Sequence, residues 1–559
     1  PTLGAIMAGG PVTFSTPGNL RVGDGTGMLD VTPGAGATIT TSHVMNTTGE
    51  SLLEFRSETG SIEFANLDGG LLDALAMSGG AARDVRIDAN RDSADGTLAF
   101  RSDVNGAVYE FGTLDLLVDE RIEFGGNVDG IRVTGGPLEL ALRNTGATNE
   151  GILVRRDDDR QGRSFTFFGE GGAGVDGISL GDTAPANAMD DMLVAEDGVD
   201  LVFDIGQERI DINAAVTAQG GEIRFEERVE LAADVTADGD GSILFRDGLD
   251  VITDAVVTAN GSGAIDLRDV LFVDGGSRML RADADTGDIQ VLFVDSEGSS
   301  GRDAFGRRDA LGLMSNGGVI RLGRVGDRTN PLGTLEADAG SGAIGFTGLS
   351  YDAGMLAFAA DRYSTRGEPT RFGHVIAGRS VPASGPDARG MADGEQVSGA
   401  TELIRFDGGA LLASGDLRFF SLLDAGMGGV ISLPDIEGPA GGDGIDLLAV
   451  GRHSVDLGSF GLDLLADDRD GRAGGPLGSV EVVTDRLGLA GEGVARVFDL
   501  QTFDFFRDIS LGDPGPDGRF PNDATLDDDD LLIVDAAELG LLDVDHFRVG
   551  SSILSQASM

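Results

Sequence analysis

The chain of 559 residues contains no cysteine, no tryptophan and no lysine, and only three tyrosines. Without cysteine there is no disulfide framework and no cysteine-based metal or redox site. Without lysine, all 41 basic residues are arginines, and they face 94 acidic residues, which gives a formal net charge of −53. This balance argues against a nucleic-acid-binding protein, because contacts to phosphates need a basic surface.

Long apolar runs are also missing. No stretch reaches the roughly 18 apolar residues of a membrane-spanning helix, so none is predicted. Glycine, by contrast, is abundant with 90 residues, about twice its usual share. Apolar residues make up 41% of the chain, which is too many for a disordered protein. The composition therefore favours many tight turns between short, partly buried segments.

One five-residue motif recurs along the chain: Gly, any residue, an aliphatic residue, any residue, then Phe or an aliphatic residue. Alternation of this kind buries one face of a short strand. The glycine is expected to turn the backbone with a positive φ. The copies are Gly60–Phe64, Gly96–Phe100, Gly221–Phe225, Gly241–Phe245, Gly263–Leu267, Gly287–Val291, Gly318–Leu322, Gly342–Phe346, Gly415–Phe419, Gly429–Leu433 and Gly478–Val482.

The spacing of these segments indicates a solenoid. The tripeptide Val-Thr-Ala begins at Val216, Val235 and Val257, at intervals of 19 and 22 residues. Strands this short cannot bury a face alone, but stacked rungs bury all inward residues in one core. The sequence predicts an all-β, right-handed parallel β-helix, a single elongated rod with loop insertions. Antiparallel sandwiches are the alternative, but Asn-Gly and Asp-Gly hairpin signals are not regularly placed.

The motif also suggests how the chain is organised. Three parts are expected: N-terminal rungs or a cap over 1–60, the β-helix body over 61–483, and C-terminal rungs or a cap over 484–559. The motif blurs at 182–191, 296–308 and 361–399. Insertions in solenoids emerge as surface loops that often carry binding residues, although loops without a function are the simpler interpretation.

No catalytic motif is recognisable. The four histidines are scattered, and no nucleophile, zinc or nucleotide signature occurs in a suitable context. The sequence therefore predicts a non-enzymatic protein. Polysaccharide-degrading enzymes with the same architecture are the alternative, since their paired carboxylates cannot be singled out among 94 acidic residues.

Calcium is the one candidate cofactor. Residues 171–178 and 441–448 fit the Gly-Gly-x-Gly-x-Asp-x-aliphatic unit of calcium-binding β-rolls, which makes Asp176, Asp443 and Asp446 candidate ligands. In β-rolls the ligands come from successive turns of tandem units. Each unit stands alone here, so an ordinary turn is the competing interpretation.

The succession of Val-Thr-Ala, Gly-x-Ile-x-Phe and Val-x-Leu, clearest from Ile210 to Val270, resembles filamentous-haemagglutinin-like and related bacterial β-strand-repeat proteins. The resemblance implies export across an outer membrane and display as a fibre, adhesin or surface layer. The chain departs from that pattern because it shows no obvious two-partner secretion domain and no carboxy-terminal membrane barrel. It is therefore expected to be a processed piece of a longer product or a different lineage.

Together these observations predict a secreted structural or adhesive protein, extracellular or at the cell surface. The open ends of a β-helix expose unpaired backbone groups, which favours self-association into filaments. The segments near Pro1–Thr13 and Val549–Met559 are the first to consider for such contacts. A monomeric adhesin that binds a glycan or a surface receptor is the alternative function, and a polysaccharide-degrading enzyme is a further one.

Overall fold

The computed structural model divides the chain into two compact units, unit 1 (Pro1–Arg268) and unit 2 (Asp269–Met559). The residues that the structure describes are 6–8, 12–14, 20–21, 30–33, 39–41, 44–45, 52–57, 62–66, 84–89, 97–118, 120–142, 151–155, 164–170, 177–181, 192–205, 209–273, 278–297, 309–326, 332–348, 350–365, 370–372, 380–381, 397–398, 403–421, 429–438, 445–451, 454–458, 477–484, 487–488, 498–505, 509–510 and 542–549.

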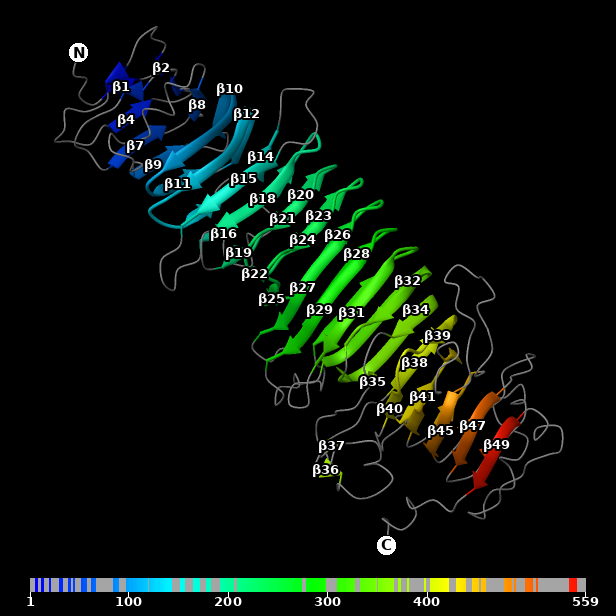
Figure 1. Cartoon of the computed structure of the whole chain (residues 1–559). Helices are drawn as coiled ribbons and strands as arrows, with labels where there is room; N and C mark the ends of the chain where they lie inside the picture. Colours follow the sequence, from blue (N-terminus) through cyan, green and yellow to red (C-terminus); the bar gives the residue numbers. More distant parts are fainter. Residues whose placement is uncertain are drawn as a thin grey trace. The chain divides into compact units, whose positions relative to one another are not determined.

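Unit 1 is built from short parallel strands that pair with their counterparts one rung further along the chain (Figure 1). Ladder A contains β2 (Val12–Phe14), β5 (Ile39–Thr41), β8 (Ile62–Asn66), β10 (Thr97–Phe111), β12 (Arg121–Val133), β14 (Gly151–Val154), β17 (Leu193–Ala195), β20 (Val216–Gln219), β23 (Val235–Asp238) and β26 (Ala255–Ala259). Ladder B contains the ends of β10 and β12, then β15 (Ser164–Gly169), β18 (Asp200–Ile205), β21 (Ile223–Phe225), β24 (Ile243–Phe245) and β27 (Ile265–Phe272), which runs into unit 2.

Ladder C of unit 1 contains β13 (Leu138–Leu140), β16 (Ile178–Leu180), β19 (Ile210–Ile212), β22 (Val229–Leu231) and β25 (Leu249–Val251). A bridge between Val118 and Leu142 joins its first rung to a five-stranded parallel sheet. That sheet contains β1 (Ile6–Ala8), β4 (Asp30–Pro33), β7 (Leu52–Ser57), β9 (Asp84–Ala89) and β11 (Leu114–Val118), and β3 (Leu20–Arg21) pairs with β6 (Val44–Met45).

Unit 2 repeats the three-ladder arrangement. Its ladder A contains β28 (Met279–Ala284), β30 (Ala310–Met314), β32 (Leu332–Phe346), β34 (Ala353–Thr365), β38 (Leu403–Asp407), β41 (Val430–Ser432), β44 (Ser454–Asp456), β46 (Leu487–Gly488) and β48 (Ile509–Ser510). Its ladder B contains β29 (Ile289–Ser296), β31 (Val319–Val325), the ends of β32 and β34, β39 (Ala410–Leu412) and β42 (Asp435–Glu437).

Ladder C of unit 2 contains β33 (Ser350–Tyr351), β35 (Thr370–Phe372), β40 (Leu417–Ser421), β43 (Leu447–Gly451), β45 (Leu477–Thr484), β47 (Phe498–Phe505) and β49 (Leu542–Val549). The pairing of β36 (Ser380–Val381) with β37 (Val397–Ser398) is the one antiparallel pairing described among these strands. The predicted parallel β-helix is thus confirmed.

The core consists of inward residues stacked in register. In unit 1, Phe167, Phe203, Phe225 and Phe245 occupy equivalent positions of ladder B, and their rings stack with centroids 5.1, 4.8 and 4.9 Å apart. All four side chains are fully buried. The Phe of the motif therefore fills the interior rung after rung, and stacked aromatic pairs add to the free energy of burying their area.

The central aliphatic residue of each of the eleven motif copies lies in a strand, but these residues do not share one rung position. Ile223 and Ile243 stack on ladder B, whereas Leu98 belongs to ladder A and Leu417 to ladder C. The motif is therefore not tied to one position in the rung. The alternation identifies inward residues, and the inward residues of all three ladders are apolar.

The expected role of the motif glycine is wrong for most described copies. The positive φ falls on the preceding glycine, for example Gly220 (82°), Gly239 (70°) and Gly261 (78°). The motif glycine is required for another reason: a Cβ atom on Gly241 would lie 2.0 Å from the carbonyl oxygen of Gly221 in the previous rung. Close backbone approach, not a left-handed conformation, selects glycine at this position.

Of the three predicted insertions, only the third can be compared with described strands. Residues 182–191 lie outside the described residues, and so does the second insertion beyond Glu297. The third insertion does not begin at Asp361, because β34 continues to Thr365 and β35 resumes the rungs at Thr370. There Tyr363 replaces the Ile of the motif opposite Ile344, which hides the rung from a search for aliphatic residues.

Candidate functional site

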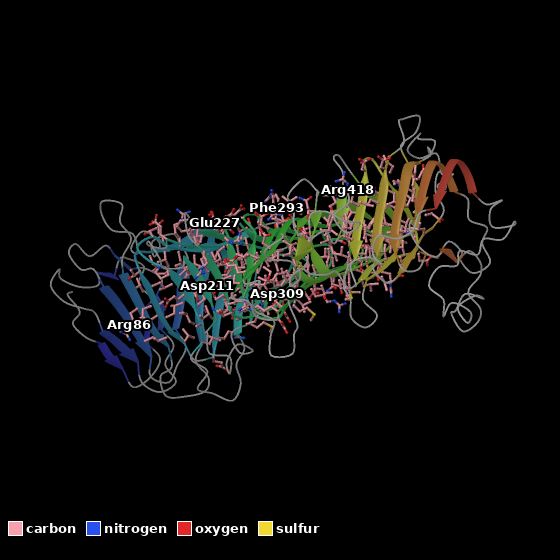
Figure 2. All side chains as sticks on the ribbon, turned by 90° about the horizontal axis from the view of Figure 1, so that it is seen from below. Arg86, Asp211, Glu227, Phe293, Asp309 and Arg418 are labelled. Carbon is pink, nitrogen blue, oxygen red and sulfur yellow. The ribbon has the colours of Figure 1, made fainter. Side chains whose placement is uncertain are left out.

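The charged and polar side chains of this fold lie mostly on the outer surface, because the inward positions are apolar. On ladder C of unit 1, Asp211, Glu230 and Asp250 share one outward register position in successive rungs (Figure 2 labels Asp211). Like charges about 4.8 Å apart repel one another. Arg209 binds Glu230 with 2.5 Å between Nη1 and Oε2, and Arg228 binds Asp250 with 2.5 Å between Nη2 and Oδ1.

Arginine connects neighbouring rungs elsewhere in the same way. Apart from the pair of the enclosed Glu123, these ion pairs are partly exposed, so each contributes about 0–1 kcal/mol and weakens with salt. The repeated cross-rung pairs nevertheless neutralise columns of carboxylates that would otherwise repel. The further pairs are Arg101–Glu123 (2.6 Å), Arg155–Glu196 (2.8 Å), Arg321–Asp288 (2.8 Å) and Arg324–Asp295 (2.9 Å).

Glu123 is the most enclosed of these carboxylates, with 4% of the residue exposed. It lies on β12 between Arg101, at 2.6 Å, and Arg121, at 3.6 Å. A buried charge is tolerated only when it stays paired, since removal of one partner leaves an uncompensated charge. Together, Glu123 and its two arginines form a compact charged cluster on ladder A.

Other carboxylates bind the backbone of the next rung. Each accepts a hydrogen bond from an N–H group at the entry to the following strand, a donor that would otherwise lack a partner in the turn. Part of the acidic surplus thus supports the fold directly. The pairs are Asp200 with Glu222 N (2.8 Å), Asp234 with Val256 N (2.8 Å), Asp240 with Ser262 N (3.1 Å), Asp288 with Val319 N (2.8 Å) and Asp416 with Asp446 N (3.0 Å).

These environments shift pKa values in both directions. Burial alone would raise the pKa of Asp288, but the hydrogen bonds from Val319 N–H and Arg321, with the arginine charge, hold it below its ordinary value. Burial raises the pKa values of Glu222 and Glu227, and also that of Asp309, despite its hydrogen bond from the Ser296 hydroxyl. Figure 2 labels Glu227 and Asp309.

The lowered pKa of Asp288 yields a pH prediction. Its contribution to stability is present above the unfolded pKa, near 4, and is lost as the pH falls through the lower folded value. Asp288→Asn should therefore cost about 1 kcal/mol or less at pH 7, because the site is partly exposed, and nothing below the folded pKa. Urea unfolding at pH 7 and at about pH 2.5 measures this difference.

Asp361→Asn provides the control, because Asp361 is an exposed residue of β34 outside the cross-rung bonds described above. Its effect on the free energy of unfolding should be small. An equal loss for Asp288→Asn at both pH values would contradict the assignment, since the carboxylate charge would then not be the source of the stability.

The calcium candidates are only partly placed. Asp176 and Asp443 lie outside the described residues. Asp446 is exposed at the start of β43, where its N–H donates to Asp416 Oδ1 and its carbonyl accepts from Leu417 N at 2.9 Å. Within the described residues, no three acidic or histidine side chains come together as a metal site. Calcium binding therefore stays a prediction.

Two of the three tyrosines lie inside unit 2. Tyr351 O–H donates to Leu322 O at 3.1 Å, and Tyr363 O–H donates to Asp407 O at 2.8 Å. Burial raises the pKa of both phenols well above the ordinary value. They therefore stay protonated and fix backbone carbonyls between rungs.

Exposed apolar side chains were not apparent from the sequence pattern. Phe293 is 47% exposed and Met279 48% exposed, although both lie within strands (Figure 2 labels Phe293). On ladder B of unit 1, Arg132 lies over the ring of Phe168, with 4.7 Å from Cζ to the ring centroid. Only the strand register shows that these side chains point outward, because each stands beside apolar residues that point inward.

No family model, no curated protein and no solved structure matches the chain. Within the described residues, no helix is long and apolar enough to span a membrane.

Proposed function

We propose that the chain is a secreted, non-enzymatic structural protein, a subunit of an extracellular filament or surface fibre whose copies stack through the edges of their rungs. One observation supports this proposal: within each unit, strands pair in parallel and in register, as β2 does with β5 in unit 1 and β47 with β49 in unit 2. A rung built in this way is complementary to another rung of the same kind.

The outer described strands supply edges for such stacking. Among the described strands, β49 pairs with β47 alone, and β2 pairs with β5 alone. A strand that is paired on one side presents unused N–H and C=O groups on the other, and such edges accept a further strand. The cross-rung pairs of arginine and carboxylate would reduce the repulsion between highly acidic copies.

Electron microscopy and sedimentation of the purified chain over a range of concentrations test this function. Filaments with the diameter of one β-helix are expected, in the extracellular or cell-surface fraction of the source cells. Single copies that never polymerise would overturn the filament. Hydrolysis or eliminative cleavage of acidic polysaccharides would overturn the non-enzymatic assignment.

Proline substitutions in β49 test the edge itself. Neighbouring N–H groups along a parallel strand point to opposite sides of the strand. Of the two variants Asp543→Pro and Val544→Pro, one therefore removes a hydrogen bond to β47. The other, the edge variant, removes an N–H group at the outer edge of β49. The edge variant should fold like the unmodified chain and fail to polymerise. Undiminished polymerisation of both variants would show that this edge takes no part.

An adhesin is the second candidate function. The observation that favours it is the stacking of Arg132 over Phe168, its register partner on the outer face of ladder B. An arginine held on an aromatic ring presents donors to a carboxylate or sulfate next to an apolar surface. Binding of acidic glycans on an array, lost in Arg132→Ala, would support this role.

A further inference from the structure

One strip of unit 2 combines small residues with charges of both signs on the outer face of ladder A. Its central column runs through Gly312, Glu336, Ala357, Arg405 and Ser432, which are register partners in successive rungs of β30, β32, β34, β38 and β41. We call these five strands, with their outward residues, the central strip. Buried residues flank Glu336 and Arg405 on their own strands, so both side chains point outward.

The charges in this column alternate across small residues. Glu336 and Arg405 lie two rungs apart, roughly 10 Å, with Ala357 between them. In the rung before Glu336 the column has no side chain, because its residue is Gly312, and a Cβ atom there would meet nothing within 4 Å. Arg405 binds Asp407 on its own strand with 2.7 Å between Nε and Oδ2, while no arginine partner of Glu336 lies among the described residues.

The neighbouring outward column is largely uncharged. It runs through Ala310, Thr334, Met355, Leu403 and Val430, all partly exposed. In a chain with a net charge of −53, five successive rungs without an acidic residue in this column offer a place where another acidic surface can approach. Apolar contact and opposite charges thus lie side by side in one strip.

We propose that the central strip is a contact between two copies of this chain, related by a two-fold axis that runs parallel to β34, just outside the surface at Ala357. This axis places β32 of one copy opposite β38 of the other. Glu336 then faces the second copy's Arg405, and the same pair forms twice. Ala357 and Met355 face their own counterparts, and Ala310 faces the second copy's Val430.

The pattern is self-complementary, as an isologous interface requires. Glu and Arg stand at equal distances on either side of Ala357, so the operation that aligns the small residues also aligns opposite charges. Asp338 would face the second copy's Asp407, whose charge is balanced by Arg405 of its own strand. A basic partner would satisfy Glu336 but would be repelled by Arg405, which makes a second copy the better occupant.

The size of the strip sets the strength of the contact. Five strands about 4.8 Å apart, with three outward positions each except β41, which has Val430 and Ser432, cover on the order of 500 Å² per copy. The total of about 1,000 Å² is at the lower limit of specific interfaces, so pairing of isolated copies should be weak. The contact is lateral and does not depend on stacking through rung edges, although copies already joined end to end would bind side by side more tightly.

Charge reversal and exchange test the proposal. Sedimentation equilibrium of the full chain at moderate salt should show reversible dimers, and Glu336→Arg or Arg405→Glu should weaken them by about tenfold or more, because two like-charge contacts replace two opposite ones. The double variant should regain the dimer affinity. Arg321→Glu on ladder B, where the arginine side chain is 46% exposed, is the matched control and should leave pairing unchanged.

The outcomes that overturn the proposal are distinct from those that overturn the filament. A monomer at every soluble concentration, unchanged pairing in both single variants, or no recovery in the double variant would each refute the lateral contact. So would a loss of folding stability in Glu336→Arg without a change in pairing, which would show that the strip binds a segment of its own chain. Filaments that persist as single, unpaired fibres in Glu336→Arg would support both proposals.

Discussion

Gly241→Ala is expected to destabilise unit 1 by about 3 kcal/mol or more, a large effect for the addition of one methyl group. The new Cβ would lie 2.0 Å from the carbonyl oxygen of Gly221 and 2.8 Å from its carbonyl carbon. Both atoms belong to the backbone of the adjacent rung, so no side chain can move aside. The rungs would have to separate locally, which would lengthen the ladder hydrogen bonds on both sides.

The same contact recurs along the column, which makes the result general. A Cβ on Gly263 would lie 1.9 Å from the oxygen of Gly241, and one on Gly221 would lie 2.0 Å from the oxygen of Val199. In unit 2 the distance from Gly342 to the oxygen of Gly318 is also 2.0 Å. At each of these positions the absence of a Cβ atom lets the backbone of the adjacent rung approach closely.

Urea unfolding, followed by circular dichroism at low protein concentration, measures the loss. Gly312→Ala is the matched control, since its Cβ would enter open space and its φ is not in the left-handed region. That variant should be unchanged or more stable by up to about 1 kcal/mol, because alanine restricts the unfolded chain. Similar unfolding midpoints for the two variants would mean that the rungs are not packed as closely as described.

The glycines show how far the sequence could be interpreted. Their periodic recurrence predicted stacked rungs correctly, because no other residue recurs in this way beside short alternating strands. The reason why glycine is needed could not be predicted, since the distance between adjacent rungs depends on pairing in three dimensions. The sequence points equally to a positive φ at Gly241, whereas the structure assigns that conformation to Gly239.

The ladders show a second limit. Alternation identified Ile223 and Leu417 as inward residues, and both are buried. It could not assign them to ladder B and ladder C, because that assignment depends on how many turn residues separate the strands of each rung. Where rung length is nearly constant, as from Val216 to Val257, the register was predicted correctly, and the Val-Thr-Ala strands pair residue by residue.

The outer surface was the least predictable part. Glu336 and Arg405 are separated by the segment 373–402, so their shared column could not be recognised before β38 was placed against β34. The net charge of −53 does not show how the charges are arranged on the surface. In the structure, many carboxylates pair with arginines or accept hydrogen bonds from backbone N–H groups of the next rung.

Phe225→Ala is expected to cost about 3–5 kcal/mol, the usual range for a large aromatic side chain removed from a packed core. The ring stacks between Phe203, at 4.8 Å, and Phe245, at 4.9 Å, and is fully buried. The cavity would interrupt the phenylalanine column and remove two aromatic contacts together. Phe293→Ala is the control, because that ring is 47% exposed and its loss should cost under about 1 kcal/mol.

The position of the damage is as informative as its size. In a solenoid each rung contacts only its neighbours, so destabilisation should remain near the altered rung. Hydrogen exchange in Phe225→Ala should therefore accelerate first in β18, β21 and β24, while β29 and β31 of unit 2 keep the protection they have in the unmodified chain. Uniform acceleration across both units would contradict this expectation, because it would mean that the chain opens as one cooperative body.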